Sequence, residues 1–387
     1  MKIISVVGAR PNFMKIAPFM KAVLKFNLDH DNYINHLLVH TGQHYDIRMS
    51  ETFFKALEIP EPDINLEIGS GSHAEQLGHT MIEFEKVLIR EKPDWVVVVG
   101  DVNATLSCSV VTKKLNIKLC HIEAGLRSGD MTMPEEINRL VTDRLSDLLF
   151  TPDLLSSENL RKEGTPEEKI RFVGNIMIDT LESNRKKAES LSVENIVKEN
   201  LIKGNKHSGK AILASPYALM TLHRPSNVDE EKVLAPLVRF LAEEVTKDLV
   251  LIWTIHPRAR KQLTKFGLWD RINDNPSLFL LEPVGYHEMV RLNMGAKLML
   301  TDSGGLQEEC CVLGTPCITL RFNTERPVTL REYGGASVLT GNNIDRIREE
   351  YHRALSLSRT PTRPELWDGH TAERIVEKLV TVDQNLR

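Results

Sequence analysis

The chain has 387 residues, of which 41% are hydrophobic and 26% charged, values ordinary for a soluble globular protein. This length favours two domains over one hydrophobic core. The net charge of −4 argues against a nucleic-acid-binding protein, so any bound anion must be held by local basic groups.

The cysteines and the apolar runs indicate a cytoplasmic protein. Five cysteines are an odd number for a disulfide framework, and Cys310 and Cys311 are adjacent within an apolar helical pattern, so we expect five reduced, buried thiols. No CxxC, HxH or HExxH spacing occurs, and we expect neither a metal nor a cofactor. The opening apolar run, residues 3–7, is too short for a signal peptide, and no later run could cross a bilayer.

Strand and helix patterns alternate along the first half of the chain. We expect strands at residues 3–7, 36–40, 95–99 and 118–122, and helices at 14–26, 76–90, 108–115 and from 137 to 150. A strand-like segment at 169–173 closes this half, and a polar stretch at 183–210 reads as exposed helix.

The alternation then restarts. We expect strands at residues 218–222, 249–255, 278–281, 297–300 and 317–320, and helices at 230–245, 286–293 and 306–313. Regular alternation predicts parallel sheets covered by helices on both faces. The sequence therefore predicts an α/β protein of two Rossmann-like, doubly wound domains, 1–174 and 175–370.

Neither half carries GxGxxG after its first strand, where Gly8-Ala9-Arg10-Pro11 stands instead, so a dinucleotide-dependent dehydrogenase is disfavoured. Ligands of doubly wound sheets bind at the carboxyl ends of the strands. The polar residues that follow predicted strands are Arg10, His40, Asp101, Glu123, His223, His256 and Ser303.

Several of these residues suit an anionic ligand. Ser303-Gly304-Gly305 opens a helix, where exposed N–H groups and the helix dipole favour a phosphate, although Asp302 or Ser303 could merely cap the helix. Glu309, one turn later, could accept hydrogen bonds from a ribose diol or could lie on a solvated helix face.

Basic residues at other strand ends extend this pattern. Arg10 and Lys15 bracket the first strand–helix turn, where guanidinium and ammonium groups can hold phosphate oxygens. His223 and His256, the latter followed by Arg258, each end a strand and could bind phosphate, protonate a leaving oxygen or simply pack.

Three carboxylates lie near predicted strand ends of the first half. Asp101 and Glu123 follow neighbouring strands, and Glu135 stands in the first turn of a helix that begins at Pro134. Acids there are also favoured by the helix dipole, and Glu135 could form a plain i,i+4 pair with Arg139. Together they suggest proton transfer, since like charges raise one another's pKa and divide acid from base roles.

The ordered motifs resemble those of the non-hydrolysing UDP-N-acetylglucosamine 2-epimerases. They are GARPNFMK (8–15), TGQHYD (41–46), GDVNAT (100–105), HIEAGLRSGD (121–130), PEEINR (134–139), TLHRPSN (221–227), HPR (256–258), TDSGGLQEE (301–309) and DGHTAERIV (368–376).

This resemblance implies a glycosyltransferase-B-type fold with the nucleotide sugar in an interdomain cleft and a C-terminal helix, 371–387, returning to the first domain. It implies acid–base roles for Asp101, Glu123 and Glu135, with His223 shared between catalysis and diphosphate binding. The remaining substrate-binding residues would be Arg10, Lys15, His256, Arg258, Ser303, Gly304, Gly305 and Glu309. Gln43 and His44 match residues that bind a second, activating UDP-GlcNAc in bacterial members, but residues 45–48 depart from the bacterial pattern, which leaves activation open.

The resemblance further implies a homodimer that interconverts UDP-GlcNAc and UDP-ManNAc for polysaccharide or glycan synthesis. The expected route is elimination of UDP to a 2-acetamidoglucal and its re-addition. Three alternatives remain: a hydrolysing relative that releases free N-acetylmannosamine, a glycosyltransferase, and a non-catalytic UDP-sugar sensor.

Overall fold

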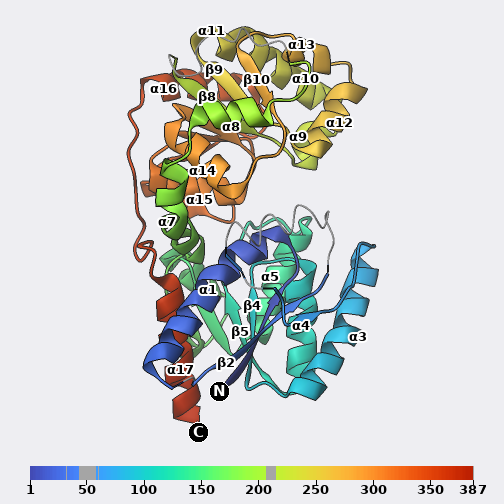
Figure 1. The fold of residues 1–387 in the computed structure, drawn as a ribbon, viewed down its shortest axis with the longest axis vertical. Coiled ribbons are helices and arrows are strands. Elements are labelled where there is room, and N and C mark those ends of the chain that lie inside the picture. Colours follow the sequence, from blue (N-terminus) through green and yellow to red (C-terminus); the bar gives the residue numbers. More distant parts are fainter. Residues whose placement is uncertain (32, 43–57, 60, 206–214, 387) are drawn as a thin grey trace. The chain divides into compact units, whose positions relative to one another are not determined.

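The computed structural model of the protein describes residues 1–31, 33–42, 58–59, 61–205 and 215–386 (Figure 1). The chain divides into two compact units: unit 1 comprises Met1–Ser183 with Pro364–Arg387, and unit 2 comprises Asn184–Arg363. The division thus falls after Ser183, within helix α7, rather than at Gly174, and the chain rejoins unit 1 at Pro364.

Unit 1 is built on a parallel sheet with the strand order β3-β2-β1-β4-β5-β6-β7 among the described residues. Its strands are β1 (Lys2–Val7), β2 (Asn35–His40), β3 (Ile64–Asn65), β4 (Trp95–Val99), β5 (Lys118–Ile122), β6 (Leu148–Thr151) and β7 (Ile170–Phe172). The five residues of β4, WVVVV, are all buried because helices cover both faces of the sheet.

Alternate strand residues of unit 1 face different helices. Its helices are α1 (Arg10–Asp29), α3 (His73–Glu91), α4 (Asn103–Lys114), α5 (Pro134–Leu145), α6 (Leu154–Lys162), α7 (Ile176–Glu189) and α17 (Thr371–Leu386). Ile4, Val96 and Val98 pack with residues of α3 and α4 in one core cluster. Trp95, whose side chain alternates with these, donates from Nε1 to Asp383 of α17, 3.1 Å away.

Hydrogen bonds hold the C-terminal helix α17 on unit 1. Asp179 of α7 accepts from the backbone N–H groups of Thr371 and Ala372, at 3.1 and 2.6 Å, and so satisfies donors at the start of α17. Lys25 of α1 pairs with Glu373 at 2.6 Å. Together with the Trp95–Asp383 hydrogen bond near the other end of α17, these contacts hold the helix beside α1 (Figure 1).

Unit 2 repeats the architecture with a parallel sheet in the order β10-β9-β8-β11-β12-β13. Its strands are β8 (Tyr217–Thr221), β9 (Val250–Thr254), β10 (Leu278–Leu281), β11 (Leu298–Thr301), β12 (Cys317–Thr319) and β13 (Ser337–Leu339). Its helices are α8 (Val193–Asn200), α9 (Pro225–Val228), α10 (Glu231–Phe240), α11 (Thr246–Asp248), α12 (Pro257–Lys265), α13 (Trp269–Asn273), α14 (Tyr286–Gly295), α15 (Gly304–Leu313) and α16 (Ile344–Ser356). Two core clusters cover its two faces: α10, α12 and α16 pack on one, and α8, α14 and α15 on the other.

The predicted fold class is confirmed, but one predicted helix was wrong. The helix expected from residue 137 to 150 ends at Leu145, and β6 begins at Leu148. Asp147 turns the chain there: its N–H donates to the carbonyl of Leu119, and its carboxylate accepts from the Leu119 N–H. The apolar residues after it therefore join the sheet beside β5.

Two other expectations concern composition. All five cysteines are free and buried, as expected. Among the described residues, no helix has both the length and the apolar character required to cross a membrane.

The first testable prediction concerns His36 of β2, whose ring bonds Ser5 Oγ through Nε2 at 2.9 Å. Burial lowers the pKa of His36 to about 4, whereas the unfolded chain has a value near 6.5. The unfolded state therefore takes up a proton first, and the free energy of unfolding decreases as the pH falls from 6.5 to 4. Urea titrations should show that the free energy of unfolding falls less across this range in His36→Gln than in the wild type, by up to about 3 kcal/mol. Parallel pH curves for the two proteins would contradict this origin.

Candidate active site

The ends of β4 and β5 bring two candidate acids close together in unit 1. Gly100 adopts φ +69° and Glu123 φ +72°, and the Gly100 N–H donates to the Ile122 carbonyl at 3.1 Å. A Cβ built on Gly100 would lie 3.1 Å from Lys15 Nζ and 3.5 Å from Glu123 Oε2. Position 100 is therefore glycine for two reasons, its positive φ and the pair that lies over it.

Lys15 and Glu123 form a buried ion pair, with side-chain exposures of 7% and 2%. Lys15 lies on α1, and its ammonium donates directly to Glu123 Oε2. Removing two charges from water is unfavourable unless each compensates the other. Lys15, which we grouped with the diphosphate ligands, is thus occupied by a candidate acid in this structure.

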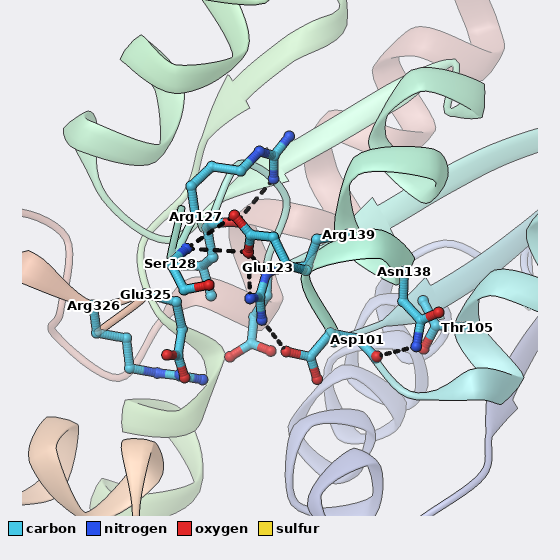
Figure 2. Close-up of polar contacts among 12 residues, drawn as sticks. Asp101, Thr105, Glu123, Arg127, Ser128, Asn138, Arg139, Glu325 and Arg326 are labelled. Atoms are coloured by element: carbon cyan, nitrogen blue, oxygen red, sulfur yellow. Dashed lines mark hydrogen bonds and ion pairs between the residues drawn. The ribbon is translucent and has the colours of Figure 1, made fainter. Parts of the chain in front are cut away.

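Asp101 is matched by a different cation, Arg139 of α5. Arg139 donates to Asp101 Oδ2 at 2.5 Å and to Glu136 Oε2 through Nε at 3.0 Å, and Figure 2 shows its guanidinium directed at Asp101. Arg139 therefore pairs with Asp101 and Glu136 and not with Glu135, the partner that its spacing suggested. Each candidate acid has its own cation, in contrast to the mutual repulsion that we expected between the acids.

Glu136 links this pair to the preceding loop. Its carboxylate accepts from the N–H groups of Ser128 and Gly129 at 2.9–3.1 Å. Burial alone would raise the pKa of Glu136, but these N–H groups and Arg139 hold it below its ordinary value. Glu136 is therefore an anion that shapes the loop after Glu123.

Glu135, by contrast, is exposed on α5 and lines a pocket of about 380 Å³ that Asp101 also lines. Other lining residues stand at helix starts: Ser72 and His73 at α3, Asn103 at α4 and Pro134 at α5. The remaining residues are Ala9, Gly69, Ser70, Gly71, Gln76, Val102 and Asn138. Asp101 and Glu135 can thus both face a ligand of sugar size.

In unit 2, Asp302 after β11 organises His223 after β8. His223 Nδ1 lies 2.8 Å from Asp302 Oδ1, and the N–H groups of His223 and Arg224 also donate to this carboxylate. Burial would raise the pKa of Asp302, but His223 and the N–H donors keep it below its ordinary value. Nδ1 is held by Asp302, and the His223 side chain remains 38% exposed. From the sequence we considered Asp302 only as a helix cap, and its contact with His223 was not predicted.

His256 lies beside His223, with ring centroids 5.6 Å apart. Burial, and secondarily the nearby His223, lower the pKa of His256. Its Nδ1 accepts from the Arg258 N–H and caps α12, so this residue also has the structural role that we left open. The Arg258 guanidinium is engaged by Asp229, with Nε 2.9 Å from Oδ1.

Helix α15 begins at Gly304, with Ser303 as its N-cap residue. A Cβ on Gly304 would lie 2.8 Å from both Arg326 Nη1 and Glu325 Oε1, whereas one on Gly305 would meet open space. Arg326 binds Glu325 and, through Nε, Glu308 Oε1 at 2.7 Å. This buried network supports the helix start. The sequence did not indicate it, because Glu325 and Arg326 lie well past the end of α15 and no spacing pattern links them to Gly304 or Glu308.

Glu309 is only 4% exposed, so the alternative of a solvated helix face is wrong. Burial, with a smaller contribution from Glu308, raises the pKa of Glu309 to about 8. Of the predicted residues, Gln43 and His44 lie outside the described residues, as does the side chain of Arg10, the residue that begins α1.

The second testable prediction follows from Glu309. Its folded-state pKa of about 8 lies above the ordinary value of 4.5, so the folded state keeps a proton that the unfolded state releases. The free energy of unfolding should therefore decrease from pH 4.5 to 8, by an amount on the order of a few kcal/mol. Glu309→Gln should lack this decrease in denaturant titrations. An unchanged pH dependence in the variant would assign the effect to other groups.

Comparisons with known proteins agree with the motif order. The model of the UDP-N-acetylglucosamine 2-epimerase family matches residues 27–380. The UDP-N-acetylglucosamine 2-epimerase of Methanocaldococcus jannaschii is 42% identical over 98% of this chain and 99% of its own length. The UDP-2,3-diacetamido-2,3-dideoxy-D-glucuronate 2-epimerase of Pseudomonas aeruginosa is 37% identical over 98% of this chain and 99% of its own length.

Solved structures give the same result. The crystal structure of the M. jannaschii enzyme in complex with UDP-GlcNAc and UDP has a TM-score of 0.86 and covers 98% of this chain and 100% of that chain. The lipopolysaccharide outer core galactosyltransferase WaaB, at 15% identity, has a TM-score of 0.50, covers 97% of this chain and 95% of that chain, and shares the fold alone. The chain therefore belongs to the UDP-N-acetylglucosamine 2-epimerase family, with a fold of the glycosyltransferase-B type.

Proposed function

We propose that this protein interconverts UDP-GlcNAc and UDP-ManNAc in the cytoplasm by inverting C2 of the sugar. One observation carries the proposal: two carboxylates, Asp101 and Glu123, stand at adjacent strand ends, each paired with a cation, and Asp101 borders a sugar-sized pocket. Relatives with nearly complete coverage are named as epimerases that act at this carbon.

The reaction that fits these groups is elimination followed by re-addition. A carboxylate removes the C2 proton while the C1–O bond breaks, which gives UDP and a 2-acetamidoglucal with a C1–C2 double bond. The diphosphate oxygen then re-adds to C1, and a proton is delivered to the opposite face of C2. We assign the two proton transfers to Asp101 and Glu123, with Glu135 assisting from the pocket wall.

Proton transfer alone does not account for the rate. General acid–base catalysis supplies about 10²–10⁴-fold, or roughly 3–5 kcal/mol. Enzymatic accelerations correspond to about 8–23 kcal/mol. The difference must come from stabilising the departing diphosphate with preorganised donors.

Unit 2 supplies suitable donors. We assign the diphosphate to the N–H groups at the start of α15, at Gly304 and Gly305, and to His223, whose Nδ1 is fixed by Asp302. An ionisable ring at this position can also protonate the leaving oxygen. Glu309 remains our candidate for the ribose, as a protonated carboxyl that can donate as well as accept at neutral pH. Arg10, Lys15, Ser303, His256 and Arg258 complete the proposed substrate-binding set.

The charge of the pocket bears on which sugar binds. Its described lining residues include Asp101 and Glu135 but no lysine or arginine. A glucuronate substrate, such as the one in the name of the P. aeruginosa relative, would bring a third carboxylate to these two. Repulsion between like charges at short range in a sheltered site is unfavourable. The pocket therefore favours the neutral hexose of UDP-GlcNAc.

The third testable prediction is an assay in deuterated water. Incubation with UDP-GlcNAc alone should yield UDP-ManNAc that carries deuterium at C2, because the acid that protonates the opposite face of C2 exchanges its proton with solvent. Mass spectrometry and NMR identify both the product and the labelled carbon. Free N-acetylmannosamine would indicate the hydrolysing relative, and no turnover without an acceptor would indicate a glycosyltransferase. Inverted product without label would refute proton abstraction.

Asp101→Asn provides the control for the acid–base role. It keeps the shape of the side chain but removes the charge that pairs with Arg139. We expect turnover to decrease by at least about 10²-fold while the Kd for UDP, measured by calorimetry, stays within a few-fold. The matched variant is Asp94→Asn. Asp94 is exposed and immediately precedes β4, the strand that Asp101 follows, so this variant should retain full activity. A non-catalytic UDP-sugar sensor would instead keep its function in both variants.

The fourth testable prediction concerns assembly, since we also propose a homodimer. Large apolar side chains are exposed in stripes on two helices of unit 1: Ile82 (54%) and Ile89 (59%) on α3, and Ile137 (43%) and Val141 (36%) on α5. Spacings of seven and four residues place each pair on one helix face. Sedimentation should give twice the mass of one chain, and Ile89→Glu with Val141→Glu should reduce it to one. A wild-type protein with the mass of a single chain would exclude the dimer.

A further inference from the structure

A buried charge network lies directly behind the two candidate acids in unit 1. His121, in β5, is fully buried, and its Nδ1 lies 2.6 Å from Asp143 Oδ1. On the opposite side of the ring, Nε2 lies 2.8 Å from the carbonyl oxygen of Gly100. Arg127 Nη1 reaches the second oxygen of Asp143 at 2.7 Å. No step assigned above uses these three side chains.

The contacts fix where the protons are. A carbonyl oxygen can only accept, so Nε2 must carry hydrogen and donate to Gly100. Nδ1 faces a carboxylate, and although burial would raise the pKa of Asp143, His121 and Arg127 hold it below its ordinary value. Asp143 therefore holds the ring through Nδ1, while Nε2 donates to the Gly100 carbonyl.

This network holds both main-chain segments that carry the acids. The Gly100 peptide is fixed on two sides: its N–H donates to Ile122 and its carbonyl accepts from His121, immediately before Asp101. Asp143 Oδ2 accepts from the Gly125 N–H at 3.0 Å, two residues after Glu123. One side-chain cluster thus sets the ends of β4 and β5 relative to each other.

Stability alone gives little reason for charges at this position. Replacing buried ion pairs by apolar residues of similar volume is often neutral or stabilising. The neighbours of His121 in the strand, Cys120 and Ile122, are apolar and fully or almost fully buried. An apolar residue at 121 could fill the core, but it could not bind the Gly100 carbonyl.

We propose that His121 is a positioning residue, which sets Asp101 relative to Glu123 by donating from Nε2 to the Gly100 carbonyl. Asp143, itself bound by Arg127, holds the ring in the orientation that makes this possible. The inference rests on the proposed epimerase activity, since it is that reaction whose geometry the network would control. It predicts an effect on the chemical step that a merely structural histidine would not have.

Two substitutions separate the two ring contacts. His121→Gln places an amide nitrogen near the position of Nε2 and can still donate to Gly100. His121→Asn places one near Nδ1, so it keeps the Asp143 contact and loses the Gly100 contact. The two variants have similar polarity and no charge, and they serve as matched controls for each other.

We expect His121→Asn to lower kcat by roughly 10²-fold, as expected for a displaced reacting group. Its KM for UDP-GlcNAc and its Kd for UDP should stay within about threefold, and His121→Gln should retain kcat within about tenfold of wild type. His36→Asn, which alters another sheet histidine, one that is hydrogen-bonded to Ser5 and far from the candidate acids in the sequence, measures the effect of lost stability alone and should keep kcat.

Equal kcat values for His121→Asn and His121→Gln, or losses that merely follow the melting temperatures, would overturn the inference. Should His121→Asn fail to fold, His121→Leu replaces it: this variant fills the core but has no donor for the Gly100 carbonyl, and an unchanged kcat would likewise overturn the inference. Failure of the proposed function is separate, since wild-type protein would then show no UDP-ManNAc formation at all.

Discussion

A carboxylate at the end of a buried parallel strand loses most of its hydration, and the fold must supply a cation or N–H donors in its place. Unit 1 meets this requirement separately for each acid: Lys15 pairs with Glu123, and Arg139 pairs with Asp101. The identities of residues on α1 and α5 follow from that need. So does Gly100, where a Cβ would crowd the Lys15 ammonium and the backbone has a positive φ.

Helix α5 is the element that satisfies most of these charges. Glu136, Arg139 and Asp143 are spaced by three and four residues, which places them on one helix face, and all three are buried. That face binds the 128–129 loop, Asp101 and the His121–Gly125 segment in turn. The outer face of the same helix carries exposed Ile137 and Val141. One helix therefore buries a charged face and exposes an apolar pair, in contrast to the usual amphipathic arrangement.

The fold was predictable because buried parallel strands have a strong local signal, as in WVVVV at β4 and LFLL at β10, which were placed to the residue. Leu148–Thr151 was assigned to a helix because its apolar residues continued the spacing of α5, and only pairing with β5 identifies it as a strand. The candidate acids were predictable for a similar reason, since strand ends can be read from the sequence. Their partners could not be: Lys15 and Glu123 are 108 residues apart, and spacing carries no information on such a contact.

The two units handle charge differently, and this suits different tasks. In unit 1, Glu123 and its cation Lys15 are buried, and Asp101 is partly buried against Arg139, so that both acids are held in place for the proton transfers that we propose. In unit 2 the groups assigned to the diphosphate are N–H groups at a helix start and a half-exposed histidine anchored from behind by Asp302. Such donors can bind a diphosphate and release it without rearranging a buried ion pair. The elimination and re-addition that we propose would need both properties, because the acids must keep their places while UDP separates from the sugar and returns.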